Sequence, residues 1–230
     1  MTTTELDPHD GLVQVRTAYR LLNAYHRRLL DLAIVTRDAV KERFGNLPKA
    51  WWYRSHFTMP PKGSNDPTSR WAYDFIALQD AAFVWASTNE PSNGGFYFAI
   101  GHTPDSATED LTKFEGEPDP IKLDPVTQAR SYLEAWVVAT TPCDSSSWDD
   151  FQSKRIVREK RIEDLWWTDR KVRTLEAHGT TIAIGGFNVD IATVWTLAAA
   201  KDNFIDPLLT LIANVSSVLP ANTGPIQLST

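Results

Sequence analysis

The sequence predicts a single α+β domain over residues 1–230, with an antiparallel sheet of about five to seven strands packed against a long N-terminal helix and C-terminal helices. Residues 10–44 carry apolar side chains three or four positions apart, which is the spacing of a helix. Apolar and polar residues alternate in 50–59 and in 70–78, and turn sequences separate these stretches from the apolar runs at 81–86 and 96–101. Strands joined by short connections form an antiparallel meander.

The N-terminal helix is predicted to span residues 10–44. Asp10 is a suitable N-cap and Gly45 stands just past the other end. No proline or glycine interrupts the chain from Leu12 to Phe44, so the helix is a rod of roughly 50 Å. A rod of this length must lie across a sheet, break, or pair with another chain. Its apolar positions are Leu12, Val15, Tyr19, Leu22, Leu29, Leu32, Val35, Ala39 and Val40.

The polar side of this helix is basic. A solvated face explains this pattern, and a contact surface for acidic residues or phosphate is the alternative interpretation. The basic residues are Arg16, Arg20, Arg27, Arg28, Arg37, Lys41 and Arg43.

The stretch AWWYRSHFTM at residues 50–59 alternates in the manner of a strand. We expect the row of Trp51 and Tyr53 to face the core, and the row of Trp52, with its polar members, to lie on the other side. Residues 70–86 are predicted to form two further strands, although their spacing also fits a helix.

Further elements follow along the chain. We expect strands at 96–101 and 130–141, separated by an acidic surface loop over 103–128 with a short helical turn around Ala107 to Phe114. A helix is predicted from about residue 148, ending near Trp167 or at Gly179. The pair Gly185-Gly186 predicts a two-residue hairpin turn. Two helices are predicted over 193–219, the second with Asp206 as its cap and Pro207 at its first position.

Composition restricts the class of protein. The chain is 42% apolar, 23% charged and 11% aromatic, with nine tryptophans, which is typical of a soluble globular protein with a sizeable core. The net charge is −6, and residues 101–153 hold eleven acids and three bases. A globally acidic protein is a poor non-specific binder of nucleic acid.

The single cysteine, Cys143, excludes an intrachain disulfide and a cysteine-based zinc cluster. Residues 1–11 are polar and acidic and lack the features of a signal peptide. No apolar stretch is long enough to span a membrane. These features favour a cytoplasmic location.

The catalytic motifs with strong signatures are absent from the sequence. It contains no Walker-type phosphate loop, no GxGxxG, no GxSxG, no HExxH and no EF-hand loop. No two histidines lie within five residues of each other, so we expect neither a metal nor a cofactor. His26 is predicted to be a packed or edge residue. His102 and His178 adjoin glycine and turn positions, which favours exposed side chains.

A polar group on the predicted sheet is the candidate catalytic site. Arg54 and His56 share one face of a strand, and Asp74 on the next strand can share it. An arginine, a histidine and a carboxylate together can bind an anion or move a proton. Trp52 would line the same site. The competing interpretation is that alternating polarity alone produces this outer sheet face.

The basic segment 154–173 is the candidate nucleic-acid site. Aromatic rings stack on bases while basic side chains hold phosphates. An amphipathic helix docked on the sheet explains the same residues, because acidic residues along it offer ion pairs. Within it, Asp169 and Lys171 match an acid-x-lysine pattern of metal-dependent nucleases, a weak match in a charged segment. The candidate binding residues are Arg158, Arg161, Trp166 and Trp167.

The absence of a catalytic signature, the long helix and the segregated charge together favour a non-catalytic binding or assembly protein. Its concrete form is self-association through the 10–44 helix, although His26, Ala33 and Thr36 make the apolar seam impure for a coiled coil. An enzyme or small-ligand binder using the polar sheet face is the first alternative. Nucleic-acid binding through residues 154–173 is the second.

Overall fold

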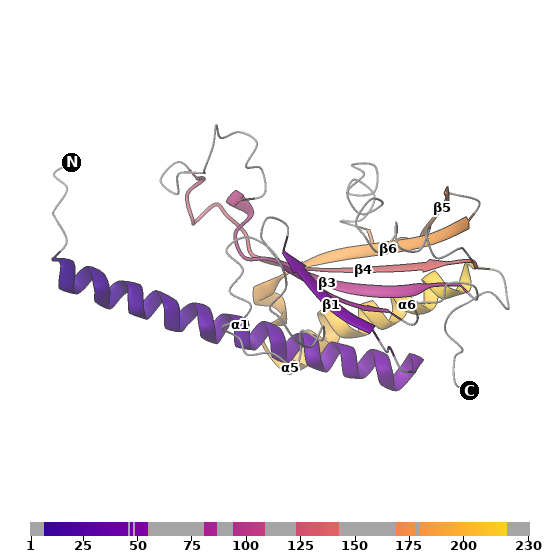
Figure 1. Ribbon diagram of the computed structural model, residues 1–230, viewed down its shortest axis with the longest axis horizontal. Coiled ribbons are helices and arrows are strands. Elements are labelled where there is room, and N and C mark those ends of the chain that lie inside the picture. Colours follow the sequence, from indigo (N-terminus) through magenta and orange to yellow (C-terminus); the bar gives the residue numbers. More distant parts are fainter. Residues whose placement is uncertain are drawn as a thin grey trace.

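The computed structural model describes residues 7–45, 47, 49–54, 81–86, 94–108, 123–142, 169–177 and 180–219. It contains one six-stranded antiparallel sheet with the strand order β1-β2-β3-β4-β6-β5 (Figure 1). The predicted α+β class and antiparallel sheet are therefore confirmed. The strands are β1 (Lys49–Arg54), β2 (Ala81–Ala86), β3 (Phe96–Thr103), β4 (Tyr132–Thr140), β5 (Arg173–Ala177) and β6 (Thr180–Asp190).

The first four strands form a meander, because each is hydrogen-bonded to the next one along the chain. The two strands predicted over residues 70–86 are found only in part, since β2 covers 81–86 and pairs directly with β1, with no strand between them. Residues 70–78 lie outside the described residues. β6 then pairs with β4, and β5 forms the edge beyond it. Between β3 and β4 the 3-10 helix η4 (Ser106–Thr108) begins where a short helical turn was predicted.

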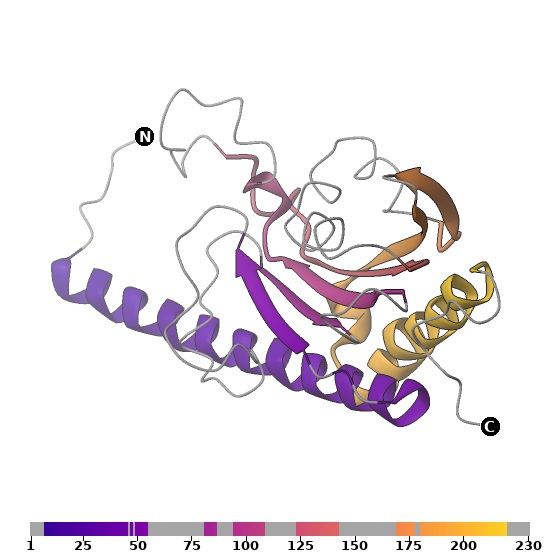
Figure 2. The same ribbon diagram turned by 45° about the vertical axis from the view of Figure 1, so that its right-hand side comes forward.

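Helices cover one face of the sheet (Figure 2). They are α1 (Pro8–Phe44) and a C-terminal group comprising η7 (Ile191–Val194), α5 (Leu197–Ala200), η8 (Lys201–Ile205) and α6 (Asp206–Ser217). Leu29 and Val40 of α1, Phe98 of β3, and Phe204 and Ile212 of the C-terminal helices belong to one buried cluster. The main core therefore lies between the sheet and both sets of helices.

Both faces of the central strands are buried. Every residue of β3 is buried, and so is every residue of β4 after Tyr132. Strands buried on both sides read as nearly continuous apolar runs, which explains the sequences FYFAI and AWVVA.

The start of α1 differs from the prediction. Asp7, not Asp10, is the N-cap, and its carboxylate accepts a hydrogen bond of 2.7 Å from the backbone N–H of His9. Pro8 occupies the first turn, where its missing N–H costs nothing. The other end is as predicted, because Gly45 adopts a positive φ of 89° that favours glycine.

The backbone of β1 pairs antiparallel with β2, and Trp52 is the register partner of Phe83. The side chains of residues 51–54 lie outside the described part of the chain. The predicted assignment of the two faces of this strand therefore stays a prediction.

The predicted hairpin at Gly185-Gly186 is wrong, because β6 runs without a break from Thr180 to Asp190. A Cβ atom on Gly185 would lie 2.7 Å from Cδ1 of Leu211 and 3.2 Å from the carbonyl oxygen of Lys171. Gly185 thus serves the close approach of α6 to the sheet, not a turn.

Substituting Gly185 by alanine is expected to lower the free energy of unfolding by about 1–3 kcal/mol, because the new methyl group overlaps the buried Leu211 side chain. Urea denaturation measures the loss. In a Leu211→Ala background the same substitution should cost clearly less, since the overlapping atom is gone. An equal cost in both backgrounds would show that the overlap is not its cause.

The C-terminal helices differ from the prediction in how they join. Asp206 was predicted to cap a second helix, but its own φ and ψ of −62° and −41° are helical. The π-helical turn η8 joins α5 to α6, and the N–H of Asp206 bonds to the carbonyl of Lys201. A wider turn of this kind accommodates Pro207, which has no N–H to give to an α-helical hydrogen bond.

The strand β5 also rules out one predicted helix end. A helix that ended at Gly179 would include residues 173–177, and these pair with β6. The remaining alternative, an end near Trp167, lies outside the described residues.

Candidate interface on the projecting helix

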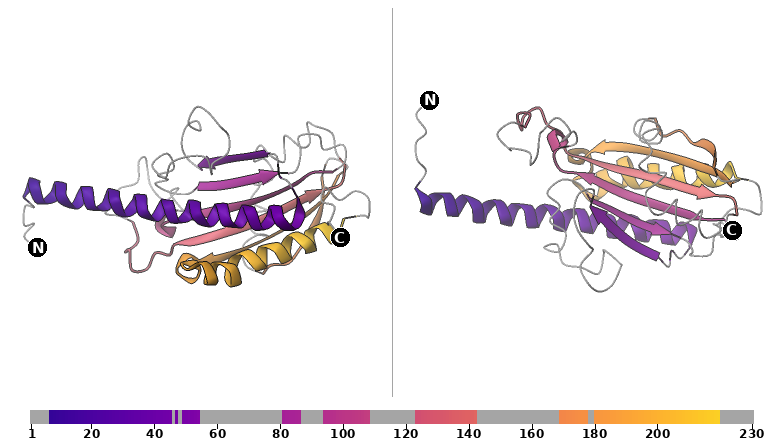
Figure 3. Two further views of the ribbon diagram at one scale, coloured as in Figure 1. Left: turned by 90° about the horizontal axis from the view of Figure 1, so that it is seen from below. Right: turned by 45° about the horizontal axis from the view of Figure 1, so that its top comes forward.

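The N-terminal half of α1 extends beyond the sheet (Figures 1 and 3). No residue from Pro8 to Tyr25 is buried, whereas eight of the residues from His26 to Phe44 are. At 1.5 Å per residue the projecting part is about 25 Å long. Half of the helix therefore packs on the domain and half stands away from it.

An exposed row of apolar side chains runs along the projecting half. Leu12, Val15, Tyr19 and Leu22 follow one another at intervals of three or four residues, and we refer to them as the apolar stripe. Their exposed fractions are 56%, 49%, 57% and 37%. Residues at this spacing lie on one side of a helix. Scattered apolar residues are normal on a protein surface, but a contiguous row is typical of an interface.

The apolar stripe continues directly into the core. The next positions at the same spacing are all buried under the sheet, and they are His26, Leu29, Ala33, Thr36 and Val40. One helical row is thus covered by the sheet along its C-terminal half and uncovered along its N-terminal half. The uncovered half has the character of a core surface that lacks its partner.

A buried polar group marks the point where α1 leaves the sheet. The hydroxyl of Tyr25 lies 2.8 Å from Nε2 of His102 on β3. His26 donates from Nδ1 to the carbonyl oxygen of Leu22, at 2.7 Å, and its ring centroid is 6.0 Å from that of His102. We call Tyr25, His26 and His102 the junction.

Two groups of the junction, His102 and Tyr25, are held in their neutral forms. Burial lowers the pKa of His102 to about 3, with a smaller contribution from the neighbouring His26. Burial also raises the pKa of the Tyr25 hydroxyl above its ordinary value of 10. Neither group changes its protonation near neutral pH, so the junction is better suited to positioning α1 than to proton transfer.

His102 was predicted to be exposed, and this was wrong. It occupies the same alternating row of β3 as Phe96, Phe98 and Ile100, which are core residues beneath the helices. The sequence shows large side chains at every second position from Phe96 to His102, but the neighbouring Gly101 was interpreted as part of a turn. The prediction of a packed His26 is confirmed, since that side chain is buried.

A second apolar surface lies beside the junction. Trp195 stacks on Tyr25, with ring centroids 6.3 Å apart and planes 18° apart. Arg28 holds this segment by donating from Nε and a terminal nitrogen to the carbonyl oxygen of Trp195, at 3.1 and 2.6 Å. Trp195 and Leu197 are nevertheless 49% and 59% exposed. The apolar surface therefore extends from α1 onto the C-terminal helices.

Charge is segregated along the projecting half. Its first residues include two acids, Asp7 and Asp10, and no acid follows until Asp31. The stretch between Asp10 and Asp31 carries four bases, among them Arg27, which forms an exposed ion pair of 3.4 Å with Asp31. The helix is thus acidic at its beginning and basic towards the sheet.

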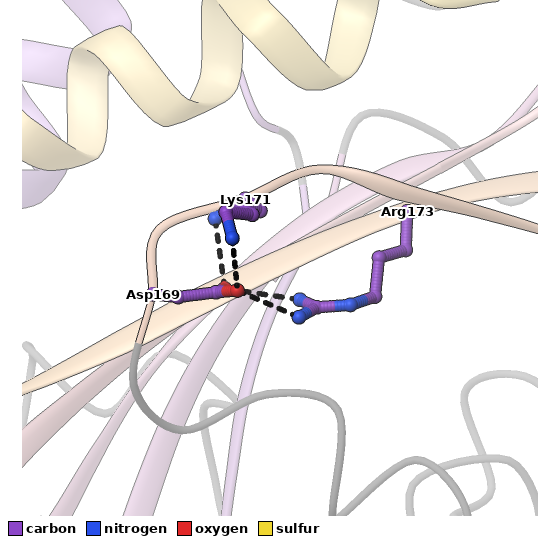
Figure 4. Close-up of polar contacts among 3 residues, drawn as sticks. All are labelled: Asp169, Lys171 and Arg173. Atoms are coloured by element: carbon purple, nitrogen blue, oxygen red, sulfur yellow. Dashed lines mark hydrogen bonds and ion pairs between the residues drawn. The ribbon is translucent and has the colours of Figure 1, made fainter.

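Asp169 and the bases around it form a separate surface contact before β5 (Figure 4). The carboxylate accepts two hydrogen bonds from Arg173, at 3.1 and 2.8 Å, and lies 3.4 Å from Nζ of Lys171. The hydrogen bonds from Arg173 chiefly lower the pKa of Asp169 to about 2. Lys171 of the acid-x-lysine pattern and Arg173, which lies beyond the pattern, both pair with its acid, and a magnesium site would need a second acid as well.

The side chains of the predicted sites lie outside the described part of the chain. This holds for the candidate catalytic residues Arg54, His56 and Asp74, and for Trp52. At positions 52 and 54 the structure describes only the backbone, as part of β1. It also holds for the candidate binding residues Arg158, Arg161, Trp166 and Trp167. These assignments stay predictions.

The described residues hold neither a metal-ligand cluster nor a membrane-spanning helix. No group of three or more histidine, cysteine, aspartate or glutamate residues in these ranges is arranged to hold a metal ion. Among the same parts of the chain, no helix combines the length and apolar character needed to traverse a bilayer.

Comparison with known proteins identifies the family. A family model described as PM0109 matches residues 5–204. The chain belongs to this family. The matched range includes the projecting half of α1, the junction and Trp195. No curated protein and no solved structure matches the chain.

Proposed function

We propose that this protein is a non-catalytic assembly protein that binds a second copy of itself through the apolar stripe. One observation carries the proposal: a single row of α1 is core along one half and exposed along the other. Covering Leu12, Val15, Tyr19 and Leu22 removes apolar surface from water, at about 25 cal/mol per Å².

A second copy suits this surface because the stripe can pair with itself. Spacing of three and four residues is the pattern by which two helices interlock their side chains. A two-fold dimer places the same patch on both sides of its interface. The polar positions that made the seam impure, such as His26 and Thr36, lie under the sheet. The exposed half of the seam is apolar throughout.

The setting that we propose for this assembly is the cytoplasm. The lone Cys143 supports this setting, since proteins of oxidising compartments commonly rely on disulfides.

Replacing Tyr19 by glutamate is expected to weaken self-association by about 100-fold or more, which corresponds to about 2.7 kcal/mol. The substitution places a carboxylate in the middle of the stripe on both copies, where association would bury it without a partner. Analytical ultracentrifugation over a concentration series measures the dissociation constant. The fold should be unaffected, because Tyr19 is 57% exposed and does not belong to the core cluster of the described residues.

Ala24→Glu is the matched control. Ala24 is also exposed on the projecting half, but it lies away from the stripe, so the same added charge should change the dissociation constant little. If Ala24→Glu and Tyr19→Glu weakened association equally, the effect would come from net charge and the stripe would not be the interface.

A further inference from the structure

We infer that the second copy lies antiparallel on the apolar stripe, so that the N-terminal end of each α1 reaches the junction and Trp195 of the other copy. This inference rests on the proposed self-association and adds its direction, its register and a docking place on the C-terminal helices.

The buried half of the helical row determines the direction. From His26 onward, the continuation of the stripe lies against the protein's own sheet. α1 is continuous to Phe44, and Figure 3 shows it running past the sheet as one rod. A parallel partner on the stripe would carry its own C-terminal half along the same line, into the space that the sheet fills. An antiparallel partner carries that half, and its sheet, away in the opposite direction.

Matching the two exposed halves sets the register. When the stripes overlap fully in opposite directions, Leu12 lies opposite Leu22 of the second copy, and Val15 lies opposite Tyr19. Each stripe then ends where the sheet of the other copy begins. A shift of one turn in either direction would leave an apolar layer uncovered or drive the helix end into the sheet.

Trp195 and Leu197 provide the docking place for the end of the partner helix. A specific stable interface buries about 1,200–2,000 Å², and a stripe of four side chains is short for that area. Trp195 stacks on Tyr25 at the end of the stripe, and the exposed Leu197 follows two residues later in the chain. Partner residues near Pro8 and His9 arrive at this point in the antiparallel register.

Disulfide cross-linking of the full-length chain tests the direction. Two single variants, Leu12→Cys and Leu22→Cys, are made in a Cys143→Ser background, and one carries a larger tag. The antiparallel arrangement predicts a covalent heterodimer only when the two are mixed and oxidised, because opposed positions bring the Cβ atoms within disulfide reach. Light scattering of each sample before oxidation reports whether it is dimeric.

The other outcomes separate this inference from the proposed function. If each variant cross-links to itself and mixing adds nothing, the copies are parallel, which overturns the inference and leaves self-association standing. A dimer that cross-links in no combination also overturns it. A wild-type chain that is monomeric overturns both.

Discussion

Replacing Phe98 by alanine is expected to lower the free energy of unfolding by about 3–5 kcal/mol. Phe98 lies in the middle of β3, is fully buried, and belongs to the core between the sheet and the helices. It pairs across the sheet with Trp85 of β2, and the two rings stack with centroids 5.0 Å apart. Truncation removes this stack and leaves a cavity in a rigid part of the molecule, because neighbouring strands hold the backbone on both sides.

Urea denaturation in a Tyr19→Glu background measures this loss without a contribution from association. Leu21→Ala is the control, because Leu21 is 67% exposed on the projecting half. That substitution should change the free energy of unfolding by less than about 0.5 kcal/mol. A Phe98→Ala loss below about 1 kcal/mol would contradict the packing described for β3.

Acid is expected to destabilise the protein through His102. In the folded chain its pKa is about 3, and its ordinary value is 6.5. Above pH 6.5 the residue is neutral in both states and contributes no pH dependence. Below pH 6.5 only the unfolded chain takes up the proton, so stability falls by about 1.4 kcal/mol per pH unit as the pH drops towards 3. The folded residue stays neutral because it is buried beside Tyr25 and His26.

The contribution is measured by comparing stability at pH 6.5 and pH 4.5 in wild type and in His102→Gln, which lacks the titrating ring. Wild type should lose about 2–3 kcal/mol more than the variant over this interval. His9→Gln, which alters an exposed histidine, should behave like wild type. Equal losses in wild type and His102→Gln would show that His102 is not held neutral.

Much of the fold was predictable because local patterns and tertiary packing agree. The unbroken apolar spacing from Leu12 to Phe44 predicted α1, and alternating or β-branched runs predicted the strands around Phe98 and Val137. The errors occurred where a residue serves a distant contact. Gly185 has the chemistry of a turn, yet it leaves room for Leu211. Asp206 has the chemistry of a helix cap, yet its backbone is helical because a π-helical turn leads into α6, whereas Pro207 does lie in the first turn of that helix.

The candidate interface was predictable only in part. The sequence identified Leu12, Val15, Tyr19 and Leu22 as one apolar row and showed that the helix exceeds the needs of a small domain. The local sequence does not show how far along that helix the sheet extends. The strands are 5 to 11 residues long, and the three-dimensional arrangement places them over the C-terminal half of α1. The exposure of the stripe follows from that placement.

The junction was missed for a related reason. Tyr25 and His102 are 77 residues apart in the chain, and their contact depends on where α1 crosses the end of β3. His102 also stands after Gly101, which suggests a turn. The glycine has another cause, since a Cβ atom there would lie 2.6 Å from the ring of Trp136. Only the packing of β3 against β4 reveals that requirement.

The mass of the unmodified chain in solution tests the central claim most directly. Light scattering at micromolar concentrations should give a particle of twice the chain mass of 25.9 kDa, and Tyr19→Glu should return it to the mass of one chain. A wild-type protein that remains at 25.9 kDa across the concentration series would contradict self-association through the apolar stripe.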